Sequence, residues 1–252
     1  MSSSSFSILG KEKKIINVKE SIFWTISGSI TFCIIFSSIL FGCMFSFRCS
    51  RYYPTISYLL SFRNHDRWIV FGITFYVSLL PLLFMSVTSK LANSITTYIS
   101  WKMNIFGICG CCAILATGII DEINGLYFLP LDTAHPFITV TGYLFLSLWM
   151  YAALFGFENI QLDLNEKTWL RRCRRSVLIC HILFAITAFE WHFAYTIYSN
   201  FLVNEVVEAL CEWSLVTLAI SLPYQISKVT NTSIHLTWSS KMAKERKMLL
   251  NS

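Results

Sequence analysis

Carboxylates and imidazoles cluster around one predicted helical hairpin of this sequence. Glu190 and His192 lie near the end of one long apolar run, and Glu212 lies near the start of the next. If the chain folds back between the two runs, these three side chains fall at a similar depth, where a carboxylate can orient an imidazole as a general base. His135 stands at the start of an earlier run and is expected at the same end of the molecule. These four residues are the candidate catalytic residues.

Structural roles compete with this chemistry for several neighbouring residues. Glu205 and Glu208 fall in the first turn of a predicted helix, where the helix dipole favours negative charge. Asp121 and Glu122 can end a helix in solvent, and His181 is expected only to hydrogen-bond a neighbouring helix. Glu190, His192 and Glu212 are harder to explain by structural roles, because ionisable groups deep in apolar helices are costly.

The elements that must position these residues follow from the apolar runs. Of the 252 residues, 55% are hydrophobic and 13% are charged, against about 25% charged in a soluble domain. The runs are long enough to cross a bilayer and lack the alternation of barrel strands. The sequence therefore predicts an all-α polytopic membrane protein, a bundle of six transmembrane helices. The runs are residues 22–47, 67–88, 103–120, 134–157, 175–199 and 205–226.

The predicted organisation is one transmembrane domain with two tails. Residues 1–21 form an N-terminal tail, 22–226 the six-helix domain, and 227–252 a basic C-terminal tail. Both tails and the second and fourth loops hold 16 Lys and Arg residues, whereas the other three loops hold 4. The positive-inside rule then places both termini in the cytosol, and the first helix is expected to be retained as a signal anchor.

The first luminal loop runs against this charge rule. Its four arginines are Arg48, Arg51, Arg63 and Arg67. Arginine holds phosphate through paired hydrogen bonds, so these residues, together with Ser57, are candidates for binding a lipid headgroup. The alternative is that the arginines snorkel at helix ends beside interfacial tyrosines.

The nine cysteines do not suggest a disulfide framework. Most lie inside predicted helices, and the run CGCC at residues 109–112 is interpreted as helix packing. Cys173, which lies beside four arginines, is a candidate for palmitoylation at the cytosolic face. No P-loop, dinucleotide fingerprint or G-x-S-x-G elbow is present.

Several short segments resemble one family of membrane proteins. The segment CSRYYPTIS at 49–57 is followed by the aromatic helix start HDRWIVF at 65–71, and later by an acidic loop that ends at His135. The last hairpin carries ALCEWSLV at 209–216. Together these segments resemble the post-GPI-attachment to proteins factor 2 family, within the wider Frag/DRAM/Sfk group of six-helix proteins.

The resemblance implies a role in lipid remodelling of GPI-anchored proteins during their maturation and transport. It places the chain in the Golgi membrane, or in the endoplasmic reticulum, where a lyso-GPI intermediate is reacylated on the luminal side. His135 or His192 would then be the base, and the four luminal arginines would meet the phosphoinositol. Whether the chain is itself the acyltransferase stays open.

The implied partners are membrane lipid and GPI-anchored proteins, with no nucleic acid. No metal or cofactor is expected, and the acyl donor and the oligomeric state stay open. The main alternative is a non-enzymatic regulator or scaffold of lipid organisation or autophagy, and a small-molecule or ion transporter is a third.

Overall fold

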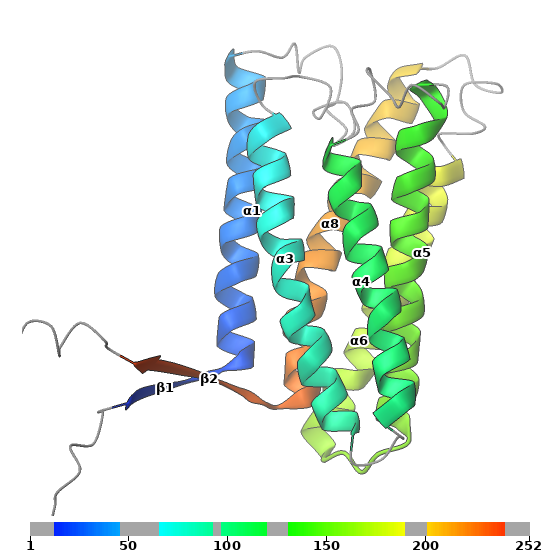
Figure 1. The fold of residues 1–252 in the computed structure, drawn as a ribbon. Coiled ribbons are helices and arrows are strands. Elements are labelled where there is room, and N and C mark those ends of the chain that lie inside the picture. The colour runs from blue at the N-terminus through cyan, green and yellow to red at the C-terminus, as the bar shows by residue number, and fades with distance from the viewer. Residues whose placement is uncertain (1–12, 46–65, 93–96, 120–130, 190–200, 240–252) are drawn as a thin grey trace, which may run out of the picture.

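The computed structural model describes residues 13–45, 66–92, 97–119, 131–189 and 201–239. Within these ranges the chain forms six helices and one two-stranded sheet (Figure 1), so the predicted all-α bundle of six helices is confirmed. The helices are α1 (Glu20–Phe45), α3 (Asp66–Leu91), α4 (Thr97–Ile119), α5 (Leu131–Glu158), α6 (Leu164–Phe189) and α8 (Phe201–Thr230). The strands are β1 (Lys13–Lys19) and β2 (Ser233–Ser239).

The start of α6 differs most from the prediction. The sequence places the basic segment before residue 175 in a loop, but α6 already begins at Leu164. The cause is a capping box, in which the backbone N–H of Glu166 donates to Asp163 Oδ1 at 2.6 Å and Asp163 N–H donates to Glu166 Oε2 at 3.1 Å. The spacing Asp-x-x-Glu is visible in the sequence and predicts a helix start here. The boundaries predicted above missed this start because they were based only on apolar runs.

The two tails form an antiparallel sheet that the sequence analysis does not predict. β1 pairs with β2 from Lys13 opposite Ser239 to Lys19 opposite Ser233. β1 holds three β-branched residues, and β2 holds two β-branched residues and a tryptophan, all of which favour this conformation. Asn231 allows the sharp turn into β2, because it takes the left-handed conformation (φ 52°) that commonly ends a helix.

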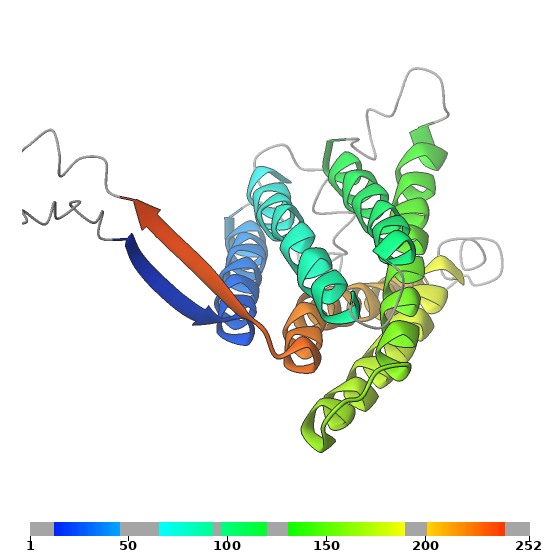
Figure 2. The same cartoon turned by 60° about the horizontal axis from the view of Figure 1, so that its bottom comes forward.

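The six helices pack in a ring. α1 packs on α3, α3 on α4, α4 on α5, α6 on α8, and α8 on α1 (Figures 1 and 2). The remaining pair, α5 and α6, pack along little of their length although they are consecutive in the chain. The sheet leaves the bundle where α1 begins and α8 ends. We call this end the terminal end and the other the distal end.

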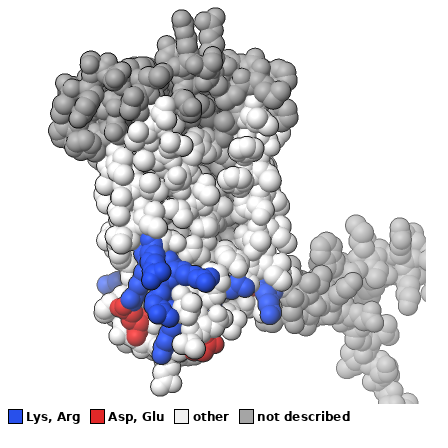
Figure 3. Space-filling view, turned by 180° about the vertical axis from the view of Figure 1, so that it is seen from behind, with Lys and Arg blue, Asp and Glu red and all other residues white. Residues whose placement is uncertain are grey.

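The outer surface of the bundle is apolar between its ends. Large hydrophobic side chains are exposed on the helices, among them Phe36, Met85, Phe155, Leu178 and Leu210. Figure 3 shows one face on which Lys and Arg gather near the terminal end, while uncharged side chains cover the middle. A soluble bundle keeps a polar outer face, so this surface fits a hydrocarbon environment.

Three helical stretches in the described ranges are long and apolar enough to cross a membrane. They are Glu20–Ser38, Trp68–Leu91 and Phe137–Glu158. A shorter apolar stretch, Lys102–Thr117, lies in α4. The chain is therefore a candidate multi-pass membrane protein by the length and composition of its helices.

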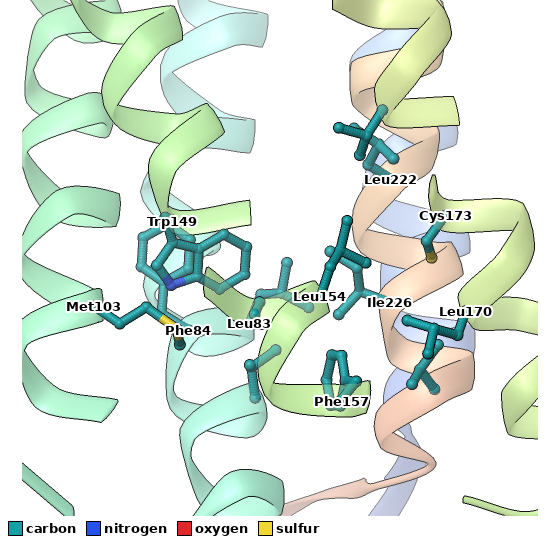
Figure 4. Close-up of a cluster of buried hydrophobic side chains, with 14 of the residues drawn as sticks. Leu83, Phe84, Met103, Trp149, Leu154, Phe157, Leu170, Cys173, Leu222 and Ile226 are labelled. Carbon is teal, nitrogen blue, oxygen red and sulfur yellow. The ribbon is translucent and has the colours of Figure 1, made fainter. Parts of the chain in front are cut away.

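A buried apolar cluster fills the ring towards the terminal end (Figure 4). Phe84 of α3 and Trp149 of α5 meet with ring centroids 4.4 Å apart. Leu154, Leu170 and Ile226 continue the cluster to α6 and α8. This cluster joins all six helices, because Trp24 of α1 and Met103 of α4 are also part of it.

Glycine allows α4 and α5 to approach closely. A Cβ built on Gly110 would lie 2.7 Å from Leu146 Cγ and 2.9 Å from the backbone nitrogen of Leu146. The contact is equally close at Gly142 of α5, where an added Cβ would lie 2.9 Å from Ile114 Cδ1 of α4. Cys111 is buried beside Gly110, so the packing interpretation of the CGCC run is confirmed at these two positions.

We expect Gly110→Leu to lower the free energy of unfolding by about 1–3 kcal/mol, the usual cost of overpacking. The backbone of α5 cannot move aside as a flexible side chain would, so the two helices must separate. Unfolding of the purified protein in detergent micelles measures the change. Cys109→Leu is the matched control, because Cys109 is exposed. Equal stability of the two variants would contradict the close contact.

Candidate functional site

A cavity of about 320 Å³ lies inside the ring, lined by residues of all six helices. Its wall is almost entirely apolar. Leu83, Phe84, Trp149 and Leu222 belong both to this wall and to the buried cluster of Figure 4. The cluster therefore closes the cavity towards the terminal end.

The cavity is elongated along the bundle. On α3 its lining runs over residues 73–84, and on α5 it runs over residues 139–150. At 1.5 Å per residue, each stretch covers about 16 Å. This length is close to half of a hydrocarbon core of about 30 Å, which is the depth of one leaflet.

A few polar groups interrupt the apolar wall. Thr31 on α1 is 1% exposed, and its hydroxyl has no hydrogen-bond partner within the described part of the chain. Its neighbours behave differently, since Ser27 and Ser38 each donate to the backbone carbonyl four residues earlier, at 2.8 and 2.7 Å. Such unpartnered buried hydroxyls are uncommon in proteins.

The hydroxyl of Tyr143 on α5 is the second such group. It is buried, and among the described residues no partner meets hydrogen-bond geometry. Ser147, one turn along the same helix, is close enough to influence it, but the two groups do not meet the geometric criteria of a hydrogen bond. By contrast, the Tyr76 hydroxyl donates to the Ile220 carbonyl at 2.5 Å and is satisfied.

His181 on α6 lines the cavity beside Tyr143. Its Nδ1 lies 2.7 Å from the backbone carbonyl of Val177 in the same helix. A carbonyl only accepts, so Nδ1 carries the proton, and Nε2 of the neutral ring is left as an acceptor. The expected bond to a neighbouring helix is therefore not the one that the structure shows, since this hydrogen bond stays within α6.

Aromatic rings close the junction between α5 and α6. Tyr143 stacks on Phe184 with ring centroids 3.9 Å apart. The imidazole of His181 lies 5.3 Å from the ring of Tyr143 and 5.3 Å from the ring of Tyr151. We call Tyr143, Tyr151, His181 and Phe184 the aromatic seam.

Most of the site residues expected from sequence lie outside the described side chains. Glu190, His192, Arg48, Arg51, Ser57 and Arg63 fall outside the described ranges. Arg67 and His135 lie near the start of α3 and of α5, at the distal end, but their side chains are not described. Glu212 is half-buried on α8 and has an interaction partner. Convergence of these residues stays a prediction.

A second polar cluster, which the sequence analysis misses, lies at the terminal end. Glu20, predicted to lie in the cytosolic N-terminal tail of residues 1–21, is 1% exposed. Its Oε1 accepts a hydrogen bond from Trp24 Nε1 at 3.1 Å, and its Oε2 accepts from Ser86 at 2.6 Å and from Thr230 at 3.1 Å. Thr232 also donates to Oε2. This carboxylate joins α1, α3, α8 and the segment before β2.

Cys173 on α6 is another residue whose burial the sequence did not predict. It is fully buried, and burial raises the pKa of its thiol to about 12. A neutral thiol without solvent access is a poor nucleophile, so the palmitoylation hypothesis is wrong. The four arginines around it are all exposed, and Arg172 lies 4.5 Å over the ring of Trp169.

The comparisons with known proteins add no relative. No known protein family, no curated protein and no solved structure matches this chain. The fold and the cavity are therefore interpreted from the residues themselves.

Proposed function

We propose that this chain is a six-span membrane protein that acts in lipid remodelling of GPI-anchored proteins. The observation that carries the lipid part is the apolar cavity, about one leaflet deep, within a bundle whose outer surface is also apolar. The GPI part rests on the motif resemblance at residues 49–57, 65–71 and 209–216. Both supports are needed, because neither alone specifies the substrate.

The proposed orientation places both termini on the cytosolic side of the Golgi or endoplasmic reticulum membrane. Arg171, Arg172, Arg174 and Arg175 are exposed on α6 near the terminal end (Figure 3). Basic residues favour the cytosolic side and the anionic lipid headgroups found there. In this orientation the distal end, with the starts of α3 and α5, faces the lumen.

The proposed chemistry is reacylation of lyso-GPI at the luminal end. The free hydroxyl of the lyso-lipid attacks the carbonyl of an acyl donor while a base takes the hydroxyl proton. The new ester forms as the bond between the acyl carbonyl and the donor breaks, and the donor group leaves with the proton that the base returns. His135 is proposed as this base, with Glu190, His192 and Glu212 as the other candidate catalytic residues. Arg67 and the remaining arginines of the first luminal loop would hold the phosphate of the headgroup.

Complementation of cells that lack their own factor of this kind tests the proposal. The wild-type chain, His135→Ala and the control His235→Ala are expressed at equal levels, and their position in the Golgi is checked. The lipid chains of purified GPI anchors are then measured by mass spectrometry. We expect wild type and His235→Ala to restore saturated diacyl anchors, and His135→Ala to fail. His235 is the matched histidine, because it lies on β2 outside the bundle.

Two outcomes would contradict the proposal in different ways. If the correctly located wild-type chain leaves lyso-GPI unrepaired, the GPI role is wrong, and the regulator or scaffold becomes the better function. If His135→Ala restores anchors as well as wild type does, the role stands and His135 is not the base.

A further inference from the structure

We infer that the central cavity holds one acyl chain of a membrane lipid, which enters through the aromatic seam between α5 and α6. This inference shares with the proposed function only the requirement that the bundle lies in a membrane. It would hold equally for a remodelling enzyme and for a lipid-binding regulator.

The wall of the cavity fits a hydrocarbon chain. Its lining is almost wholly apolar, and its length of about 16 Å matches the depth that an acyl chain spans in one leaflet. Its volume of about 320 Å³ is at the lower end of the range for small-molecule sites, about 300–1,000 Å³. A long, narrow and apolar site suits an unbranched chain better than a broad, polar ligand.

Two of the polar groups in the wall, Tyr143 and His181, give the chain a direction. Tyr143 and His181 lie about 15 and 17 residues from the ends of α5 and α6 at the terminal end, so they stand about 22–26 Å above it. Met150 and Leu222 line the cavity only about 8 residues from the same end, or about 12 Å. The methyl end of the chain therefore points to the terminal end, and its polar junction lies near Tyr143 and His181.

These polar groups suit the junction between an acyl chain and its ester. The Tyr143 hydroxyl is buried and lacks a geometrically normal partner among the described residues, so it can donate to a carbonyl oxygen. Nε2 of His181 is an acceptor, because Nδ1–H is used by the Val177 carbonyl. One donor and one acceptor at this height can hold an ester carbonyl and a neighbouring hydroxyl.

The weakest junction of the ring supplies the route. α5 and α6 pack along little of their length, and the aromatic seam covers the cavity there. Exposed apolar side chains flank the seam on the outside, including Leu144 and Leu148 on α5 and Leu178 and Ile182 on α6. A lipid chain that passes between these helices stays in contact with apolar surface throughout.

Photolabelling of the full chain tests the site. The protein is placed in phosphatidylcholine nanodiscs that contain a trace of phosphatidylcholine with a diazirine near the methyl end of one acyl chain. After irradiation, peptide mass spectrometry locates the label. We expect label on Met150, Trp149 and Leu222, which line the terminal end of the cavity. Label confined to outward-facing residues such as Leu148, Phe155 and Leu178 would overturn the inference.

A matched pair of variants sharpens the result. Val177→Phe fills the cavity, because Val177 is buried in its wall, whereas Ile179→Phe adds the same ring at an exposed position of α6 that lines neither the cavity nor the seam. We expect label within the cavity to fall to background in the first variant and to persist in the second. Persistent cavity label in a folded Val177→Phe protein would contradict the site. If that variant does not fold, the labelled residues of the wild-type protein still show whether the acyl chain lies in the cavity.

The occupant and the route are tested separately. A diazirine sterol that labels the cavity while the phosphatidylcholine probe does not would overturn the acyl chain as ligand. Phe184→Ala removes one ring of the aromatic seam and is expected to raise the initial labelling rate several-fold, with the partly exposed Ile186→Ala as control. An unchanged rate would contradict access between α5 and α6. Failure of the GPI complementation would leave all these labelling results unaffected.

Discussion

Replacing Glu20 with alanine is expected to lower the free energy of unfolding by about 3–5 kcal/mol, since hydrogen bonds to a charged group contribute about 1.5–3 kcal/mol each. The carboxylate is fully buried and accepts from Trp24, Ser86, Thr230 and Thr232. Alanine removes the acceptor and leaves these donors in a site without solvent. Unfolding in mixed detergent micelles, followed by tryptophan fluorescence, measures the loss.

Two control variants separate charge from shape at Glu20. Glu20→Gln keeps one carbonyl oxygen and nearly the same volume, so we expect an intermediate loss. Lys19→Ala changes the preceding exposed residue and is expected to stay within about 0.5 kcal/mol of wild type. If Glu20→Ala were equally mild, the carboxylate would not hold α1, α3 and α8 together.

A double-mutant cycle tests the longest contact of this cluster. Thr232 follows α8 but donates to Glu20 at the start of α1, 212 residues earlier. The losses of Thr232→Val and Glu20→Gln should fall short of additive by more than about 0.5 kcal/mol, as is usual for residues in one hydrogen-bond network. Simple additivity would mean that the two side chains act independently.

Replacing Trp149 with alanine is expected to cost about 3–5 kcal/mol, the usual loss for a buried tryptophan. Trp149 is 2% exposed, packs on Phe84, and donates from Nε1 to Asn104 Oδ1 at 3.3 Å. Asn104 in turn donates to Thr88 at 2.8 Å, so the indole ends a chain of hydrogen bonds across three helices. The same unfolding assay measures the loss.

Controls at this position distinguish packing from hydrogen bonding. Trp149→Phe keeps an aromatic ring against Phe84 but leaves Asn104 Oδ1 without its donor, so a smaller loss is expected. Leu148→Ala truncates the preceding side chain, which is 51% exposed, and is expected to be nearly neutral. A Trp149→Ala protein as stable as Leu148→Ala would show that the indole does not stabilise the bundle through its packing and its hydrogen bond.

The polar contacts of the described residues concentrate at the terminal end. Besides the Glu20 cluster and the Trp149 chain, Lys90 of α3 pairs with Glu166 of α6 at 3.0 Å. The Glu20 cluster and the Lys90–Glu166 pair join helices that are distant in sequence, whereas the Trp149 chain joins the consecutive helices α3, α4 and α5.

The sequence by itself determined the helices. Long apolar runs must satisfy their backbone hydrogen bonds internally, and that local requirement predicted six helices, each of which overlaps one helix of the structure. The prediction was wrong where a local signal opposed hydropathy, as in the capping box that begins α6 at Leu164. The sheet between the tails was missed for another reason, since strand pairing depends on a partner more than 200 residues away.

Only the tertiary structure decided which polar residues are buried together. Glu20 and Cys173 were expected at an aqueous surface, yet both are buried, because helices from distant parts of the chain cover them. Likewise Thr31, Tyr143 and His181 come from three helices, and nothing in their spacing indicates a shared cavity. A run of residues encodes the hydrogen bonding of one helix, but a cavity is the space that six packed helices leave between them, and its lining depends on contacts that no single segment contains.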